Sequence, residues 1–266
     1  VKGGLVRWDG QRFEWFGVAD GLPDDSILLP CPGDATRLWL SRDTGVHHDG
    51  ERFHNVDLHL PGDREILSAW SDGEHRLLLG TSSGVWRAGT GGRCIGLEGV
   101  GVLALFRDAD GCLWVSAENG IYRQSADGFQ AFAALAGMPT AQKMVGDHAG
   151  GLWFICRGHG VYQWDGRRLR EFRLDGALAS QGSALHVDRR GAVWLGAWGS
   201  ALSRFDGHWI RSMPLDSAPE IRRVESLCEG SDGEVWLSTW GGGVMRVDGD
   251  AAYRVEELAD CGLYLW

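Results

Sequence analysis

The chain has 266 residues, of which 44% are hydrophobic and 23% are charged, so it is long enough to bury a substantial core. Its net charge of −10 argues against an electrostatic grip on nucleic acid or on an anionic membrane surface. The sequence contains no apolar stretch long enough for a membrane-spanning helix, and its N-terminal residues lack the apolar core of a signal peptide. We therefore expect no nucleic-acid partner and no direct membrane insertion of this segment.

A tryptophan-centred unit recurs along the chain. Its apolar tripeptide is centred, in chain order, on Trp39, Leu78, Trp114, Trp153, Trp194 and Trp236. Successive centres lie 36 to 42 residues apart, which is typical of propeller blades. Each unit contains short apolar runs separated by Asp-Gly or glycine turns and has no helical periodicity, which predicts four antiparallel strands. Because such a sheet cannot cover both of its faces alone, the repeated tryptophan is predicted to pack each sheet against the next.

The two ends of the chain complete one further unit. If "CGLYLW" at 261–266 is joined to "VKGGLVRWDG" at 1–10, the result matches "TRLWLSRDTGVHHDG" at 36–50. A blade centred on Tyr264 and completed by residues 1–21 removes the exposed sheet edges at both ends. The sequence therefore predicts one all-β domain over residues 1–266, a seven-bladed β-propeller of four-stranded antiparallel blades whose last blade is shared by the N- and C-termini.

Several motifs resemble the two-component regulator propeller repeat. They are "GLPDDSI" at 21–27, the repeated Leu-Trp strand, the glycine turn that follows it, and the aromatic-Asp-Gly turns "RWDG", "QWDG" and "RFDG". The resemblance implies an extracytoplasmic or periplasmic sensor propeller of the kind found in bacterial membrane-bound histidine kinases and diguanylate cyclases. The large sensors of that family carry two stacked propellers, an immunoglobulin-like domain and a transmitter, whereas this chain has seven units and neither of the other parts.

Ligand contacts are expected on one face of the propeller. The loops that leave the tryptophan strands and the connections that enter the innermost strands should lie together there, around the channel. Trp198 and Trp240 are additional tryptophans, distinct from the packing tryptophans, and they occupy equivalent positions in adjacent units. Indoles stack on sugar rings or other flat groups, and arginines pair with carboxylates. The predicted ligand-binding residues are Arg42, Glu118, Asn119, Arg157, His159, Trp198, Arg222 and Trp240.

The favoured function is therefore noncovalent sensing of a small molecule or glycan fragment, with a signalling partner or fused transmitter and with no cofactor. Each indole could instead simply cover its neighbouring blade. Two other functions stay open: a lyase or hydrolase that uses His159 with Arg157 or Glu118, and a protein-interaction platform. No nucleophile or metalloprotease motif is present.

Neither histidines nor cysteines suggest a metal site. The four histidines at 47–60 are expected on the surface without converging on one ion. The six cysteines show no close spacing and are expected to be small buried residues or free thiols.

Overall fold

The computed structural model describes most of the chain. The described residues are 5–8, 12–23, 29–30, 38–40, 44–49, 51–60, 65–71, 77–89, 92–156, 158–172, 181–199, 202–207, 210–213, 215, 221–230 and 232–258. Its contacts form two compact units, Val1–Val102 and Leu103–Trp266, and each is described by itself. The single domain expected from the sequence stays a prediction.

The first unit contains three antiparallel sheets. One sheet has two strands, β1 (Leu5–Trp8) and β2 (Phe13–Phe16). A second has four, namely β3 (Leu29–Pro30), β4 (Leu38–Leu40), β5 (Thr44–His48) and β6 (Phe53–Asp57). The third consists of β7 (Ile66–Ser71), β8 (Leu77–Thr81), β9 (Gly84–Arg87) and β10 (Arg93–Gly96). The 3₁₀ turn η1 (Val18–Asp20) follows β2.

The second unit contains four four-stranded sheets, together with the 3₁₀ turns η2 (Ala133–Leu135) and η4 (Glu256–Leu258). The first two sheets are formed by β11 (Val102–Arg107), β12 (Leu113–Ala117), β13 (Gly120–Ser125) and β14 (Gly128–Ala131), and by β15 (Ala141–Gly146), β16 (Leu152–Cys156), β17 (Gly160–Trp164) and β18 (Leu169–Phe172). The other two are formed by β19 (Gly182–Val187), β20 (Val193–Ala197), β21 (Leu202–Phe205) and β22 (Ile210–Met213), and by β23 (Arg223–Glu229), β24 (Val235–Trp240), β25 (Gly243–Asp248) and β26 (Ala251–Arg254).

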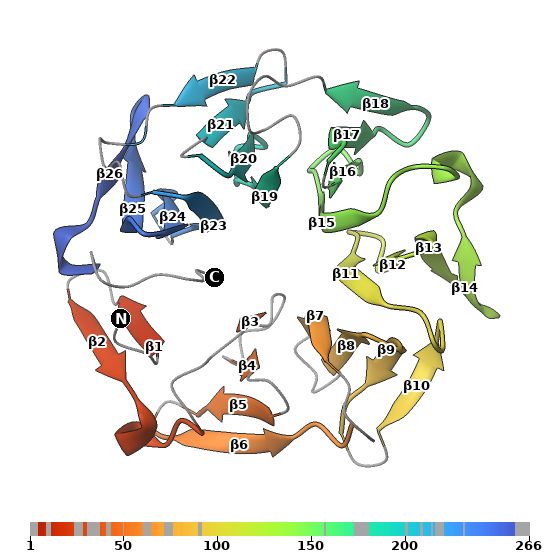
Figure 1. Cartoon of the computed structure of the whole chain (residues 1–266), viewed down its shortest axis with the longest axis horizontal. Coiled ribbons are helices and arrows are strands. Elements are labelled where there is room, and N and C mark those ends of the chain that lie inside the picture. Colours follow the sequence, from red (N-terminus) through yellow and green to blue (C-terminus); the bar gives the residue numbers. More distant parts are fainter. Residues whose placement is uncertain are drawn as a thin grey trace. The chain divides into compact units, whose positions relative to one another are not determined.

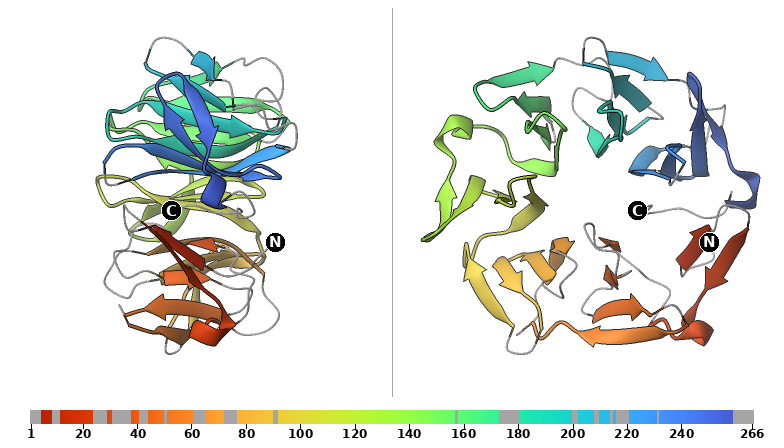
Figure 2. Two further views of the ribbon diagram at one scale, coloured as in Figure 1. Left: turned by 90° about the vertical axis from the view of Figure 1, so that its left-hand side faces the viewer. Right: turned by 180° about the vertical axis from the view of Figure 1, so that it is seen from behind.

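Every four-stranded sheet is a meander in which neighbours in sequence are neighbours in space. In the second unit the first strands, β15, β19 and β23, lie along one edge, and the fourth strands lie along the other (Figure 1). The view from behind shows the same order (Figure 2). The predicted four-stranded antiparallel units are therefore confirmed, and each repeated tryptophan or leucine centre lies in the second strand of its sheet.

The two-stranded sheet of β1 and β2 is only part of the seventh predicted unit. β1 and β2 pair from Leu5 with Phe16 to Trp8 with Phe13. The strand predicted around Tyr264, which would complete this sheet from the C-terminus, lies outside the described residues.

Trp114, Trp153 and Trp194 of the second unit lie between sheets, as the repeat predicts, whereas Trp236 is only partly buried. Trp153 in β16 is 1% exposed, stacks on Phe172 of its own sheet and contacts Phe205 of the next sheet. Trp114 and Trp194 are 5% and 4% exposed and occupy the corresponding positions in clusters that also join neighbouring sheets. Burial of such large rings stabilises the stacking of one sheet on another.

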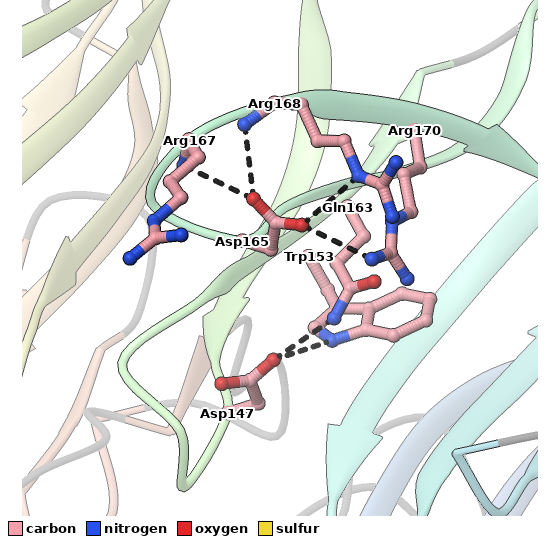
Figure 3. A network of polar contacts seen from close by, with 7 residues as sticks. All are labelled: Asp147, Trp153, Gln163, Asp165, Arg167, Arg168 and Arg170. Atoms are coloured by element: carbon pink, nitrogen blue, oxygen red, sulfur yellow. Dashed lines mark hydrogen bonds and ion pairs between the residues drawn. The ribbon is translucent and has the colours of Figure 1, made fainter.

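An aspartate in the turn before each of these strands holds the indole. Trp153 Nε1 donates to Asp147 Oδ2 at 3.1 Å, and Gln163 Nε2 donates to the same oxygen at 3.2 Å (Figure 3). The other oxygen, Oδ1, accepts the backbone N–H of Gly151 at 2.7 Å. The equivalent pairs are Asp108 with Trp114 and Asp188 with Trp194. The Asp-x-x-Gly segment is thus both a hairpin turn and the anchor of the packing ring.

The aromatic-Asp-Gly turn in "QWDG", between β17 and β18, is a hairpin turn, as predicted, whereas Asp9 and Gly10 of "RWDG" lie outside the described residues. Asp165 Oδ1 accepts the backbone N–H groups of Arg167 and Arg168, and Asp165 Oδ2 pairs with Arg170 (Figure 3). These backbone hydrogen bonds, with the nearby arginines, hold the pKa of Asp165 below its ordinary value. An aspartate whose side chain bonds the backbone two and three residues later favours a tight turn.

His186 in β19 makes folding stability sensitive to acid. Burial lowers the pKa of its imidazole below the ordinary 6.5, while Glu229 and Asp188 act in the opposite direction. Because the unfolded chain binds this proton more readily, stability falls as the pH drops through the unfolded value, by at most about 1.4 kcal/mol per pH unit for one proton. We expect the urea midpoint of the wild type to fall more steeply than that of His186→Gln between about pH 7.5 and pH 5. Equal slopes would contradict this role.

One histidine expectation is wrong. His48 is 7% exposed, and its ring packs against Phe53 and Phe16, with centroids 4.6 and 5.7 Å apart. It is a core residue because the outer strand and β2 cover that face of β5. His54, by contrast, is exposed and contacts Asp49 Oδ2 at 2.7 Å.

Candidate ligand-binding site

The first strand of four sheets carries a β-bulge at the same place. In β23 the register shifts between Val224 and Ser226, so Glu225 is the extra residue. The equivalent residues are Leu67 in β7, Gln142 in β15 and Ser183 in β19. A bulge redirects side chains and often lies beside a functional site. Among these four bulges, that in β23 alone carries a charge, and Glu225 is only 6% exposed.

Arg223 lies between two tryptophans because of backbone pairing. It is opposite Trp240 of β24 in its own sheet, and it forms an isolated antiparallel bridge with Trp198 of the preceding sheet. Two backbone hydrogen bonds reinforce this arrangement: Gly199 N donates to Arg222 O at 2.9 Å, and Arg222 N donates to Trp240 O at 2.8 Å. Backbone pairing within the sheet and with the preceding sheet therefore places one indole on each side of Arg223.

The side chains meet as the backbone predicts. The guanidinium carbon of Arg223 is 4.9 Å from the ring centroid of Trp198 and 5.3 Å from that of Trp240, within the range of cation–π attraction. The two indole centroids are 6.4 Å apart at 60°. Trp198 remains 37% exposed and Trp240 47% exposed. We call these three residues and Glu225 the indole–arginine site.

Glu225 orients the guanidinium. Arg223 Nε donates to Glu225 Oε1 at 2.5 Å, and Arg223 Nη2 lies against the same oxygen. The side chains are 22% and 5% exposed, so the pair is largely withdrawn from water. Desolvation offsets much of the attraction in such pairs, and their main effect is to hold charged groups in one geometry. The contact with Glu225 thus holds the guanidinium between the indoles.

The loop arrangement predicted for the site holds within the second unit. Trp198 N donates to Gln181 O at 3.2 Å, which places the loop after β20 beside the connection that enters β19. Thr140 Oγ1 donates to Glu118 O at 3.2 Å, which does the same for the loop after β12 and the connection that enters β15. Loops that leave tryptophan strands therefore lie beside the connections that enter innermost strands.

The other predicted residues fall into two groups. Arg42 and Arg157 lie outside the described residues. Glu118, Asn119, His159 and Arg222 are described and exposed. Asn119 Oδ1 accepts the hydroxyl of Tyr122 at 3.0 Å. Arg222 adjoins the indole–arginine site, but the arginine that contacts both indoles is its neighbour Arg223.

Glu118 and Asn119 border a separate hollow of about 370 Å³. Its remaining walls are mostly apolar and come from the start of β13, the end of β14 and the connection through η2 to Thr140. None of the four residues of the indole–arginine site lines it. We place the candidate site at the indoles, because convergent charge and exposed aromatic surface occur together there.

The structure shows no histidine–acid pair at His159 among the described residues; its backbone N–H donates to Cys156 O at 3.0 Å. No group of three or more metal-ligating side chains gathers in the described ranges.

Four described cysteines, Cys94, Cys112, Cys156 and Cys228, are free thiols, while Cys31 and Cys261 lie outside those ranges. Burial raises the pKa of Cys156 and of Cys228 to about 12. No helix in the described parts has the length and apolar character needed to span a membrane.

Reasoning from the sequence missed Glu225 and passed over Arg223 in favour of Arg222. A signal was present, because "VESLCE" aligns with the first strands "AQKMVG" and "GSALHV", places a charge at its second position and follows two consecutive arginines. Which arginine contacts the indoles depends on the bulge and on pairing with the preceding sheet, and neither can be inferred from the local sequence pattern.

Comparisons with known proteins support the fold alone. No protein-family description matches the sequence, and no curated protein does. Among solved structures, a streptogramin B lyase is 15% identical over 86% of this chain and 85% of its own, with a TM-score of 0.66. The extracellular domain of a hybrid two-component system from B. thetaiotaomicron is 14% identical, with a TM-score of 0.69 over 88% of this chain and 35% of that one. YCF48, solved bound to D1 peptide, is 13% identical over 88% and 86%, with a TM-score of 0.65. Together with the repeated four-stranded sheets, these similarities show that the chain has a seven-bladed β-propeller fold.

Proposed function

We propose that this chain is a recognition propeller that binds a ring-bearing small molecule or glycan fragment noncovalently at the indole–arginine site. The observation that carries the proposal is the pair of exposed indoles around one guanidinium that a buried carboxylate holds in place. Flat apolar faces of a sugar or aromatic ring pack on indoles, and the guanidinium supplies directed N–H donors at their edge. A site that is ordered before binding loses less entropy when the ligand arrives.

We place this recognition in a bacterial signalling system, on the extracytoplasmic side. The motifs that resemble the two-component regulator propeller repeat support this, as does the fold that the chain shares with an extracellular two-component domain. Signalling requires a ligand with different affinities for two states of the sensor or of its complex with a partner. No catalytic step is proposed.

Both indoles are expected to be needed for binding. In a thermal-shift screen of the 266-residue chain against sugars, uronic acids, amino acids and small carboxylates, a ligand at 100 times its dissociation constant stabilises the fold by roughly 2.7 kcal/mol. For a hit, we expect Trp198→Ala and Trp240→Ala each to weaken binding by more than about tenfold, as truncation of a central tryptophan does. Unfolding free energy should change by only about 1 kcal/mol, because both rings are already partly in water.

Tyr253→Ala is the matched control. Tyr253 lies on the outer strand β26 of the same unit and is 50% exposed. Its loss should leave binding unchanged. If a ligand still binds after both tryptophan substitutions, its site lies elsewhere. If no compound in the panel stabilises the chain, the recognition role is contradicted.

A further inference from the structure

Two cationic side chains, Arg223 and Lys143, interact electrostatically at the indole–arginine site although the chain carries a net charge of −10. Arg222 and Arg223 are consecutive, and Lys143 lies within electrostatic reach of Arg223 and Glu225. Glu225 is the carboxylate that interacts with both Arg223 and Lys143. These three side chains together carry one net positive charge, which favours a negatively charged ligand.

Lys143 comes from the same inner edge of the second unit as Arg223. It lies in β15 just after the bulge, and β19 packs against both β15 and β23 (Figure 1). Loss of surrounding water lowers the pKa of Lys143, Arg223 lowers it further, and Glu225 raises it. Solvent still reaches the side chain. Among the described residues, none forms a hydrogen bond or an ion pair with its ammonium group.

Arg223 also has donors to spare. Its Nε and Nη2 both meet a single oxygen of Glu225. A guanidinium has five N–H groups in a planar fork, so three further donors remain beyond the two engaged by Glu225. Such a fork matches the paired oxygens of a carboxylate or a phosphate.

We propose that the ligand of the indole–arginine site is an anion: a ring that packs on Trp198 and Trp240 and carries a carboxylate or phosphate bound by Arg223 and Lys143. This inference rests on the proposed recognition function and adds the charge class of the ligand. Lys143 then acts as the second cation of the site, and Glu225 offsets part of the repulsion between the two cations.

The test uses probes that differ at one carbon. Glucose, glucuronate and glucose 6-phosphate share a ring and differ in charge, and benzamide and benzoate provide a second pair. Binding of each probe to the 266-residue chain is measured by ligand-observed NMR titration, at low salt and at about 0.5 M salt, where surface attraction is screened. We expect the anionic members to bind about tenfold or more tightly than the neutral members, as for one charge-assisted hydrogen bond, with the preference reduced at high salt. Tighter binding of glucuronate or of glucose 6-phosphate identifies the anionic group.

Variants separate this inference from the function on which it rests. Lys143→Gln should abolish the preference for the anion, Lys143→Arg should retain it, and Arg211→Gln, a change of an exposed arginine on the outer strand β22, should have no effect. Equal affinity for neutral and anionic probes, abolished by Trp198→Ala, would overturn the anionic ligand and leave the recognition site standing. An anion preference unchanged in Lys143→Gln would overturn the role of Lys143. Probes that bind the tryptophan variants as well as the wild type, or that never bind, would overturn both proposals.

Discussion

Replacement of Trp153 by alanine is expected to lower the unfolding free energy by about 3–5 kcal/mol, the range for a large buried aromatic side chain. The indole is 1% exposed, its ring centroid is 4.9 Å from that of Phe172 and 5.1 Å from that of Phe205, and its Nε1 donates to Asp147. Removal would empty the space between two sheets and leave their remaining side chains unable to close the gap completely. Urea denaturation followed by circular dichroism measures the loss.

The same substitution at Trp198 is the matched control, because that indole is 37% exposed. We expect a loss there of about 1 kcal/mol. The loss of unfolding free energy in Trp153→Phe should lie between those of Trp153→Ala and Trp198→Ala, since phenylalanine keeps a ring in the gap but removes the donor to Asp147. If Trp153→Ala and Trp198→Ala destabilised the chain equally, the role of the repeated tryptophan in packing the sheets would be refuted.

The second large effect is expected at the pair formed by Arg223 and Glu225. Arg223→Met leaves a carboxylate with a 5% exposed side chain without its cation, which should cost about 3 kcal/mol or more. Glu225→Gln keeps the shape and an oxygen acceptor and should cost about 1–2 kcal/mol. The double variant Arg223→Met/Glu225→Leu removes both charges, so it should be more stable than Arg223→Met alone.

A double-mutant cycle over Arg223→Met, Glu225→Leu and their combination, measured by urea denaturation, isolates the coupling between the two side chains. We expect a coupling above about 1 kcal/mol, because the two groups are in direct contact. Additive losses would show that the two side chains act independently, and the account of a guanidinium held in place by Glu225 would then be wrong. Ligand binding should be lost in every variant that lacks Arg223.

Much of the fold was predictable because it depends on local chemistry that is repeated. The tryptophan centres, the Asp-x-x-Gly turns and the aromatic-Asp-Gly turns recur at a blade-sized interval, and each acts within one sheet or one hairpin. Asp165, for example, bonds backbone groups two and three residues away, so its turn can be recognised in four letters. The pair of extra tryptophans was recognisable for the same reason, since equivalent positions in two neighbouring repeats should lie close together.

The sequence by itself determined the strand pattern, the packing role of Trp114, Trp153 and Trp194, and the placing of Trp198 and Trp240 at corresponding positions at the ends of their tryptophan strands. Only the tertiary structure decided that Arg223 rather than Arg222 lies between the indoles and that Glu225 is buried against it. The physical reason is that these contacts depend on a bulge and on the pairing of two different sheets. The period of a repeat specifies which residues are equivalent, but the side chains that meet are set by register and by the packing of one sheet on the next.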